Sequence, residues 1–175
     1  MRSVAAGAAV LLAGTGLAAC FGVVEAPQFH FLAGESGAFY SGQAIPVQNT
    51  CDGEDVSPLL GWDDVPEQTG AFVLIVRDRD ADGFVHWVLT DIPGDVTELP
   101  EGRGDSIGIP GQNDFGRVGW GGPCPPSGEH AYEFKLYALT GPLQLDGAIT
   151  VDVVERAMAT NVTGTTAIVG TYSRR

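Results

Sequence analysis

The segment Asp78-Arg79-Asp80-Ala81-Asp82-Gly83-Phe84-Val85-His86-Trp87 is a mostly polar stretch that links two apolar runs. The first run, Ala71 to Val76, is continuous, and the second, His86 to Ile92, is nearly so. Their lengths and their content of β-branched residues are typical of strands buried on both faces of a sheet. The sequence therefore predicts two central strands joined by a polar connection.

More strands are expected on both sides of this pair. From Ala131 to Leu139 apolar and polar residues alternate, as in a strand with one face in the core. The apolar face would consist of Tyr132, Phe134, Leu136 and Ala138. Shorter strands are expected over three further ranges: Phe29 to Leu32, Leu59 to Trp62 and Thr166 to Tyr172.

One helix is expected late in the chain. The range Thr150 to Ala159 carries an apolar stripe, and Thr150 suits the N-cap position. The range Pro93 to Gly128 is rich in Gly and Pro and is expected to be mostly loop, and so long a loop is usually functional. Short strands with one late helix favour a mainly β fold, either a sandwich or a barrel.

The composition limits the classes of partner. A chain of 175 residues suggests one domain, large enough to bury a core without a lattice of disulfides. It has 22 acidic and 9 basic residues, a net charge of −13. That balance argues against nucleic acid or an anionic membrane surface as a general partner. It does not exclude one small anion held by donors in a local pocket.

The N-terminus has the layout of an export signal. Met1-Arg2 is a positive start, Val4 to Ala19 is apolar, and the ending Leu17-Ala18-Ala19-Cys20 resembles a bacterial lipobox. We therefore expect a lipoprotein-type signal peptide over 1–19, lipidation at Cys20, a tether over 20–27 and a domain over 28–175. The protein would be exported and anchored to the cell envelope by its lipid. The alternative is an ordinary cleaved signal that leaves the protein periplasmic or secreted.

Cys51 and Cys124 remain in the expected domain. An even pair in an exported protein is compatible with a disulfide, but the sequence does not fix their separation in space. Two separate buried thiols are the alternative. A metal site built on these two alone is not expected, because neither has a second ligand at zinc-finger spacing.

Polar side chains gather near the ends of the predicted strands. Asp78 and Asp80 follow one strand, His86 begins the next, and His130 and Tyr132 begin a later one. If the chain remains extended after Asp78, both carboxylates point the same way. Imidazoles, a phenol and loop amides are donors that suit a phosphate or carboxylate. The carboxylates would orient the histidines or face the ammonium group of a zwitterionic ligand.

Four stretches resemble the phosphatidylethanolamine-binding protein (PEBP) family, in particular its bacterial Raf-kinase-inhibitor-like (YbhB/YbcL) branch. They are Cys51-Asp52-Gly53-Glu54-Asp55-Val56-Ser57-Pro58-Leu59-Leu60-Gly61-Trp62, Asp78 to Pro93, Asn113-Asp114-Phe115-Gly116 with Gly121-Gly122-Pro123-Cys124-Pro125-Pro126, and His130-Ala131-Tyr132 with Leu136-Tyr137-Ala138-Leu139. The similarity extends over about residues 28 to 172.

This resemblance implies a mainly β, PEBP-like antiparallel β-sandwich with one or two peripheral helices. It also implies a pocket for phosphate, acetate or a phosphorylethanolamine-like group, lined by Asp78, Asp80, His86, Pro125, Pro126, His130 and Tyr132. Three positions depart from the family pattern: Arg79 and Asp82 replace the prolines of Asp-Pro-Asp-Ala-Pro, and Ala131 replaces the arginine of His-Arg-Tyr. Loss of that arginine is expected to weaken anion affinity or to open the mouth of the pocket, with Arg79 as a candidate to compensate.

The function expected from these features is non-enzymatic binding of a small anion or headgroup, with modulation of an unidentified protein partner in the manner of a kinase or protease inhibitor. No cofactor and no resident metal are expected. The alternative is a metal-dependent hydrolase that uses the Asp/His cluster, since such residues are common metal ligands. It is less favoured because no tight ligand spacing such as His-Glu-x-x-His is present.

Overall fold

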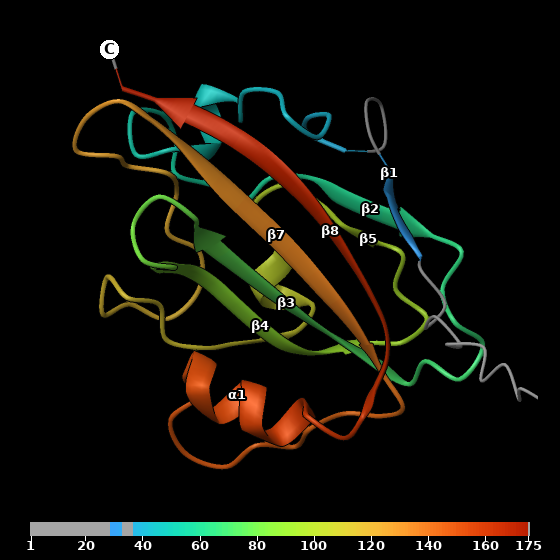
Figure 1. Ribbon diagram of the computed structural model, residues 1–175. Coiled ribbons are helices and arrows are strands. Elements are labelled where there is room, and N and C mark those ends of the chain that lie inside the picture. The colour runs from blue at the N-terminus through green and yellow to red at the C-terminus, as the bar shows by residue number, and fades with distance from the viewer. Residues whose placement is uncertain (1–28, 33–36, 175) are drawn as a thin grey trace, which may run out of the picture.

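Two antiparallel sheets make up the body of the computed structural model, which describes residues 29–32 and 37–174 (Figure 1). The small sheet has the order β1-β2-β5, with β1 at His30–Leu32, β2 at Leu60–Asp63 and β5 at Glu98–Leu99. The large sheet has the order β6-β4-β3-β7-β8. Its strands are β3 at Ala71–Asp78, β4 at Val85–Pro93, β6 at Ile109–Pro110, β7 at Glu129–Leu139 and β8 at Val162–Ser173. The expected antiparallel β architecture is confirmed.

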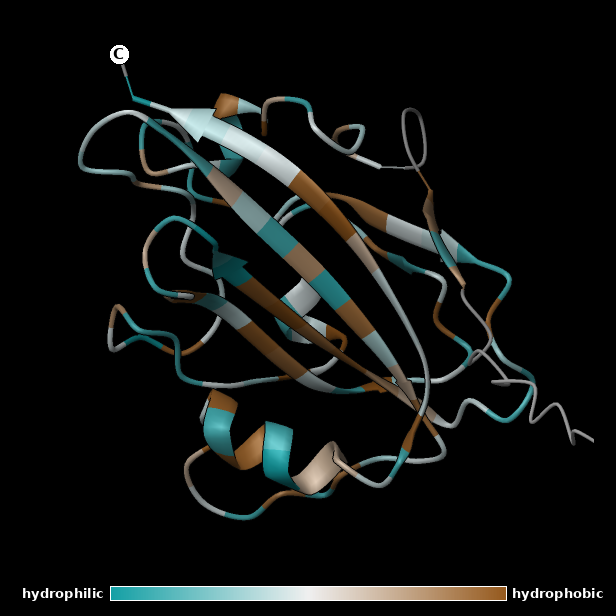
Figure 2. Cartoon of the chain, viewed as in Figure 1, coloured by the Kyte–Doolittle hydropathy of each residue, from teal (hydrophilic) through white to brown (hydrophobic). Residues whose placement is uncertain are grey.

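The main core lies between the two sheets. Phe72, Leu74 and Val76 of β3 pack there with Trp62 of the small sheet, whose ring centroid is 5.3 Å from that of Phe72. The apolar face predicted for β7 also lies in this core, and all four of its residues are buried. Figure 2 shows the alternation along β7 as bands of hydrophobic and hydrophilic residues. The two-residue period of the strand therefore determines which side chains enter the core.

The opposite face of the large sheet is covered by the helix. Helix α1, Val151–Met158, packs Val154 and Met158 against Val73 and Ile75 of β3 (Figure 1). Strands β3 and β4 are consequently buried on both faces, as their apolar runs predicted. Thr150 occupies the expected N-cap position, but only its backbone carbonyl takes part, by accepting the Val154 N–H at 3.0 Å.

The range predicted to be mostly loop contains three short elements. β5 completes the small sheet, β6 forms an edge of the large one, and a 3-10 helix spans Gly104–Ser106. A second 3-10 helix spans Val47–Asn49. Strands of two residues contain no full alternation, so the sequence pattern could not reveal them.

Strand register brings the polar strand ends together. Asp78, the last residue of β3, pairs with Tyr132 of β7, and Arg77 pairs with Val85 at the start of β4. His86 and His130 therefore lie at the same end of the large sheet as Asp78.

The expected signal peptide, the lipidation site Cys20 and the tether over 20–27 lie outside the described residues. Residues 29–32 and 37–174 contain no helix long and apolar enough to cross a membrane.

Candidate functional site

A cavity of about 220 Å³ opens where β3 ends and β4 and β7 begin. Its walls come from the turn after β3, the two following strands and the loop before β7. The lining residues are Asp78, Ala81, Phe84, His86, Phe115, Cys124, Pro125, Pro126 and His130. Five of the seven residues predicted to bind a ligand are in this set: Asp78, His86, Pro125, Pro126 and His130. A cavity of this size suits a small group rather than an extended molecule.

The buried Asp78 and the half-buried His130 form a pair on one wall. The Nδ1 of His130 lies 2.7 Å from the Oδ2 of Asp78, and the aspartate side chain is only 5% exposed. Because a carboxylate accepts, the His130 Nδ1 is the donor and the Nε2 is left for the cavity. The contact is the one expected between a carboxylate and a histidine of this site, and it fixes the orientation of the imidazole.

His86 is held by the backbone on another wall. Its Nδ1 donates to the carbonyl oxygen of Gly121 at 2.7 Å. Three aromatic rings surround it edge-on, with centroids 5.1 Å away for Tyr132 and Phe115 and 5.4 Å for Phe84. Burial lowers the pKa of His86 below its usual value of 6.5, although the Gly121 carbonyl and Asp78 oppose this effect. At neutral pH the ring is therefore neutral, with its proton on Nδ1.

Tyr132 lies beneath the cavity and does not line it. The residue is fully buried between the rings of His86 and His130. Within residues 29–32 and 37–174, its hydroxyl has no hydrogen-bond partner. Burial and the negative charge of Asp78 raise the pKa of Tyr132, which keeps the phenol neutral and able to donate. The Asp78 carboxylate is nevertheless close enough for its hydrogen bonding to contribute to the raised pKa of Tyr132.

Asp80 also lies outside the lining, because the chain turns after Asp78 instead of remaining extended. The Asp80 N–H donates to Asp78 Oδ1 at 2.8 Å, and the Arg79 N–H donates to the Ala131 carbonyl. The Asp80 carboxylate accepts the Ala131 N–H at 2.8 Å and is exposed. The two carboxylates consequently have different roles. Asp78 faces the cavity, whereas Asp80 joins the turn to β7.

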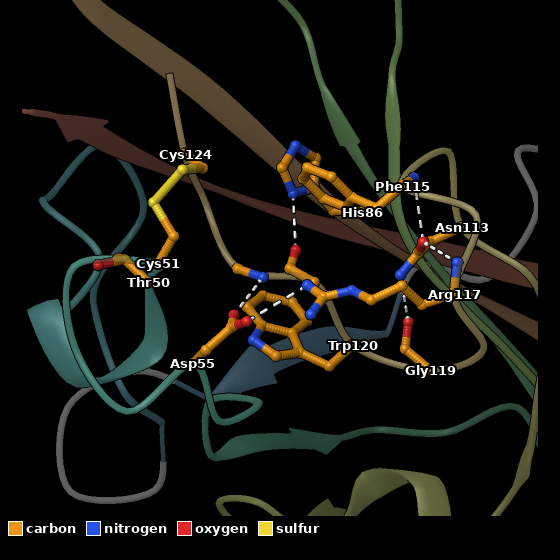
Figure 3. A network of polar contacts seen from close by, with 12 residues as sticks. Thr50, Cys51, Asp55, His86, Asn113, Phe115, Arg117, Gly119, Trp120 and Cys124 are labelled. Carbon is orange, nitrogen blue, oxygen red and sulfur yellow. Dashed lines mark hydrogen bonds and ion pairs between the residues drawn. A yellow bond between two sulfur atoms is a disulfide. The ribbon is translucent and has the colours of Figure 1, made fainter. Parts of the chain in front are cut away.

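The loop before β7 is attached to the loop that follows the Val47–Asn49 turn. Cys51 and Cys124 form a disulfide with their Cα atoms 5.4 Å apart, and the Cys51 N–H donates to the Pro123 carbonyl. Asp55 accepts the Gly122 N–H through Oδ1 at 2.7 Å and pairs with Arg117 through Oδ2 at 3.2 Å (Figure 3). The prolines that follow Cys124 thus belong to a wall that is fixed both covalently and by hydrogen bonds.

Sequence reasoning did not identify Ala81, Phe84 and Phe115 as lining residues. Phe84 directly precedes the strand that carries His86, and Phe115 belongs to a stretch that matched the family pattern. Their positions were a usable signal, but an apolar residue in a loop is not distinguishable from ordinary packing by sequence alone. Phe115 is 41% exposed and lies at the mouth of the cavity.

Within residues 29–32 and 37–174, no three metal-ligating side chains at the cavity lie close enough to share an ion. In the part of the chain that the structure describes, one set of three could share an ion, namely His30, Asp63 and Asp64. This set is exposed and lies on the small sheet, away from the cavity. The Asp/His cluster of the cavity instead pairs internally, through His130 and Asp78.

Known proteins resemble this chain over most of its length. A model of the family described as phosphatidylethanolamine-binding protein matches residues 35–173. A UPF0098 protein of Aquifex aeolicus is 46% identical over 151 residues, covering 79% of this chain and 86% of the relative. Another UPF0098 protein, from Methanothermobacter thermautotrophicus, is 46% identical over 145 residues, covering 78% and 95%.

Solved structures share the fold. A phosphatidylethanolamine-binding protein homologue of Chlamydia trachomatis superposes with a TM-score of 0.77 at 30% identity. YbcL of Escherichia coli, described as a member of the mammalian PEBP family, superposes with a TM-score of 0.74 at 31% identity. Each comparison covers 85% of this chain and 99% of the other.

Proposed function

Because this chain belongs to the phosphatidylethanolamine-binding protein family, we propose that it binds a small anion or a phosphorylethanolamine-like headgroup in the cavity beside His86 and His130, without covalent chemistry. Family membership supports a binding-type protein in general. The specific ligand class rests on the donors that surround the cavity.

The observation that carries the proposal is the pair of imidazoles fixed at the cavity wall. Each donates through Nδ1 to an acceptor of the protein, His130 to Asp78 and His86 to Gly121. Each therefore keeps Nε2 for a ligand. At His86 this nitrogen is unprotonated in the neutral ring, so it accepts from a protonated phosphate oxygen or an ammonium group, and it donates to an anion only when the ring gains a second proton. The neutral hydroxyl of Tyr132 lies behind them, next to the carboxylate of Asp78. His86 is buried among aromatic rings, and the low dielectric of such surroundings strengthens a hydrogen bond to it.

Calorimetric titration of the purified protein with inorganic phosphate and phosphorylethanolamine tests this function. Removing the imidazole in His130→Ala is expected to weaken binding by about 10- to 100-fold, the usual loss for a hydrogen bond to a charged group. His30→Ala is the matched control, because His30 also lies near an aspartate but is 67% exposed on the small sheet. It should bind as the wild type does.

Unchanged affinity in His130→Ala would contradict the assignment of the cavity. Bound metal together with hydrolysis of a phosphomonoester would favour the hydrolase instead. Comparing phosphate with phosphorylethanolamine separates a general anion site from one that also recognises the ammonium group.

A further inference from the structure

Asp55 and His86 contact the two ends of one peptide group. The Gly122 N–H donates to Asp55 Oδ1 at 2.7 Å, and the Gly121 carbonyl accepts from His86 Nδ1 at 2.7 Å (Figure 3). The carbonyl of Gly121 and the N–H of Gly122 belong to the same peptide bond, which is planar with these groups opposed. Carboxylate, peptide and imidazole are therefore connected by two successive hydrogen bonds.

A negative charge at the N–H end of a peptide increases the negative charge on its carbonyl oxygen. Consecutive hydrogen bonds polarise one another in this way, and bonds to an ionised partner are the stronger ones. The Gly121 carbonyl thus becomes a better acceptor for the His86 Nδ1–H. This effect keeps the proton on Nδ1 and holds the ring with Nε2 available to the cavity.

The backbone around these groups is built for close approach. A Cβ on Gly122 would lie 2.6 Å from Asp55 Oδ1 and 2.7 Å from the Asn49 carbonyl oxygen, so only glycine fits. Asp55 itself has a φ of 54°, in the left-handed region that aspartate and asparagine tolerate better than most residues. The Cys51–Cys124 disulfide joins the same two loops nearby.

We propose that Asp55 is a positioning residue that sets the tautomer and orientation of His86 through the Gly121–Gly122 peptide, and its effect on ligand affinity rests on the proposed function. Asp55 is not among the residues that line the cavity, and it acts only through the peptide. Arg117 moderates this effect, because its guanidinium contacts the second oxygen of the same carboxylate.

Other charged and titratable groups also act on His86. Asp78 comes from β3, Asp114 from the loop after β6, and Tyr132 from β7, with His130 on the same strand. The test must therefore distinguish the effect that Asp55 exerts on His86 through the peptide from the direct electrostatic effect of nearby charges on His86. The strength of the Nδ1–H hydrogen bond provides this separation, because it responds mainly to the acceptor that it contacts.

The test is NMR of the protein labelled with ¹⁵N-histidine, without ligand, comparing wild type with Asp55→Asn. Asparagine keeps the shape and tolerates the same φ, but it removes the charge. The expected result is an upfield shift of the His86 Nδ1–H proton and a lower pKa of His86. Asp91→Asn is the matched control, because Asp91 has a φ of 52° and accepts the Leu143 and Gln144 N–H groups far from the cavity. It should leave His86 unchanged.

Arg117→Gln provides a second variant that leaves Asp55 in place. It is expected to shift the Nδ1–H proton downfield, the opposite direction, because the freed carboxylate polarises the peptide more strongly. An unchanged Nδ1–H in folded Asp55→Asn would overturn the proposal. If that variant does not fold, an unchanged or upfield-shifted proton in Arg117→Gln would overturn it.

Calorimetry with inorganic phosphate then relates the effect to binding. A loss of about three- to tenfold is expected in Asp55→Asn, the loss of part of one hydrogen bond. If wild type binds no phosphate although the NMR shifts occur, the proposed function fails and the positioning role stands. If phosphate binds but the Nδ1–H proton does not respond, the positioning role fails and the proposed function stands.

Discussion

At the scale of single residues, many polar side chains bond to the backbone, whether or not they face the cavity. Several aspartates accept main-chain N–H groups: Asp78, Asp80, Asp91 and Asp114 do so in turns and at strand ends. An aspartate that takes part in such a contact is fixed in place, and so is the loop that it contacts. The acidic composition therefore has a structural use beyond solubility.

Burial of His86 predicts a pH dependence of stability. Burial lowers its pKa in the folded protein, whereas the unfolded chain protonates near 6.5. Below that pH the unfolded state binds more protons, so the free energy of unfolding falls as the pH falls. One such group contributes at most about 1.4 kcal/mol per pH unit. Urea unfolding between pH 7.5 and 5.5 measures this slope.

His86→Gln removes the titration and should give a shallower decline over that range. Asp52 and Glu101 also have lowered pKa values. Carboxylates titrate below this pH range, so their contribution to the stability of the folded protein is lost only at more acidic pH. Equal slopes for wild type and variant would show that His86 does not carry the effect.

The lining of the cavity could be predicted only in part from single residues. His86, His130 and Asp78 could be identified because their chemistry belongs to their side chains and because strand ends were visible in the sequence. The partner of His86 could not be identified, because Gly121 contributes a backbone carbonyl, which every residue carries. The role of Asp55 was hidden for the same reason. Asp80 was misplaced because its position depends on where the chain turns.

At the level of elements, strands with a strong hydrophobic pattern could be predicted from the sequence, and strands with a weak pattern were shortened or missed. Strands β3, β4 and β7 have long apolar or alternating runs, and their predicted ranges agree with the structure to within a few residues. Strand β8 was predicted too short, because Val162 to Thr165 mixes Gly and Thr with one apolar residue. β5 and β6 were missed altogether.

Helix α1 contributes stability through one buried stripe. Met158 is 5% exposed against the outer face of the large sheet, whereas Arg156 is exposed to solvent. Met158→Ala should lower the free energy of unfolding by about 2–5 kcal/mol, through lost burial and a residual cavity. Arg156→Ala should change it by about 0.5 kcal/mol or less. Chemical denaturation of both variants checks this difference, and equal losses would contradict the packing of α1.

At the scale of the whole molecule, the disulfide links loops that are 73 positions apart in the sequence. Replacing both cysteines in Cys51→Ser/Cys124→Ser should destabilise the protein by about 2–5 kcal/mol, chiefly by freeing the unfolded chain. Cys124 also lines the cavity, so phosphate affinity should fall as well. Thermal unfolding with and without reductant measures the effect. If reductant also lowers the unfolding temperature of the double variant, the effect of reductant does not come from this disulfide.

The outer edge of β8 is attached to a segment that lies far from it in the sequence. β8 pairs with β7 along its length, and its other edge is bonded to the segment near Gly42, whose N–H donates to the Val169 carbonyl at 2.7 Å. Gly42 and Val169 are far apart in the sequence, so the hydrogen bond between them closes a long loop of the chain. This edge of the large sheet is therefore completed only when two distant segments of the chain meet. Sheets assembled from such distant segments form slowly, in about milliseconds to seconds.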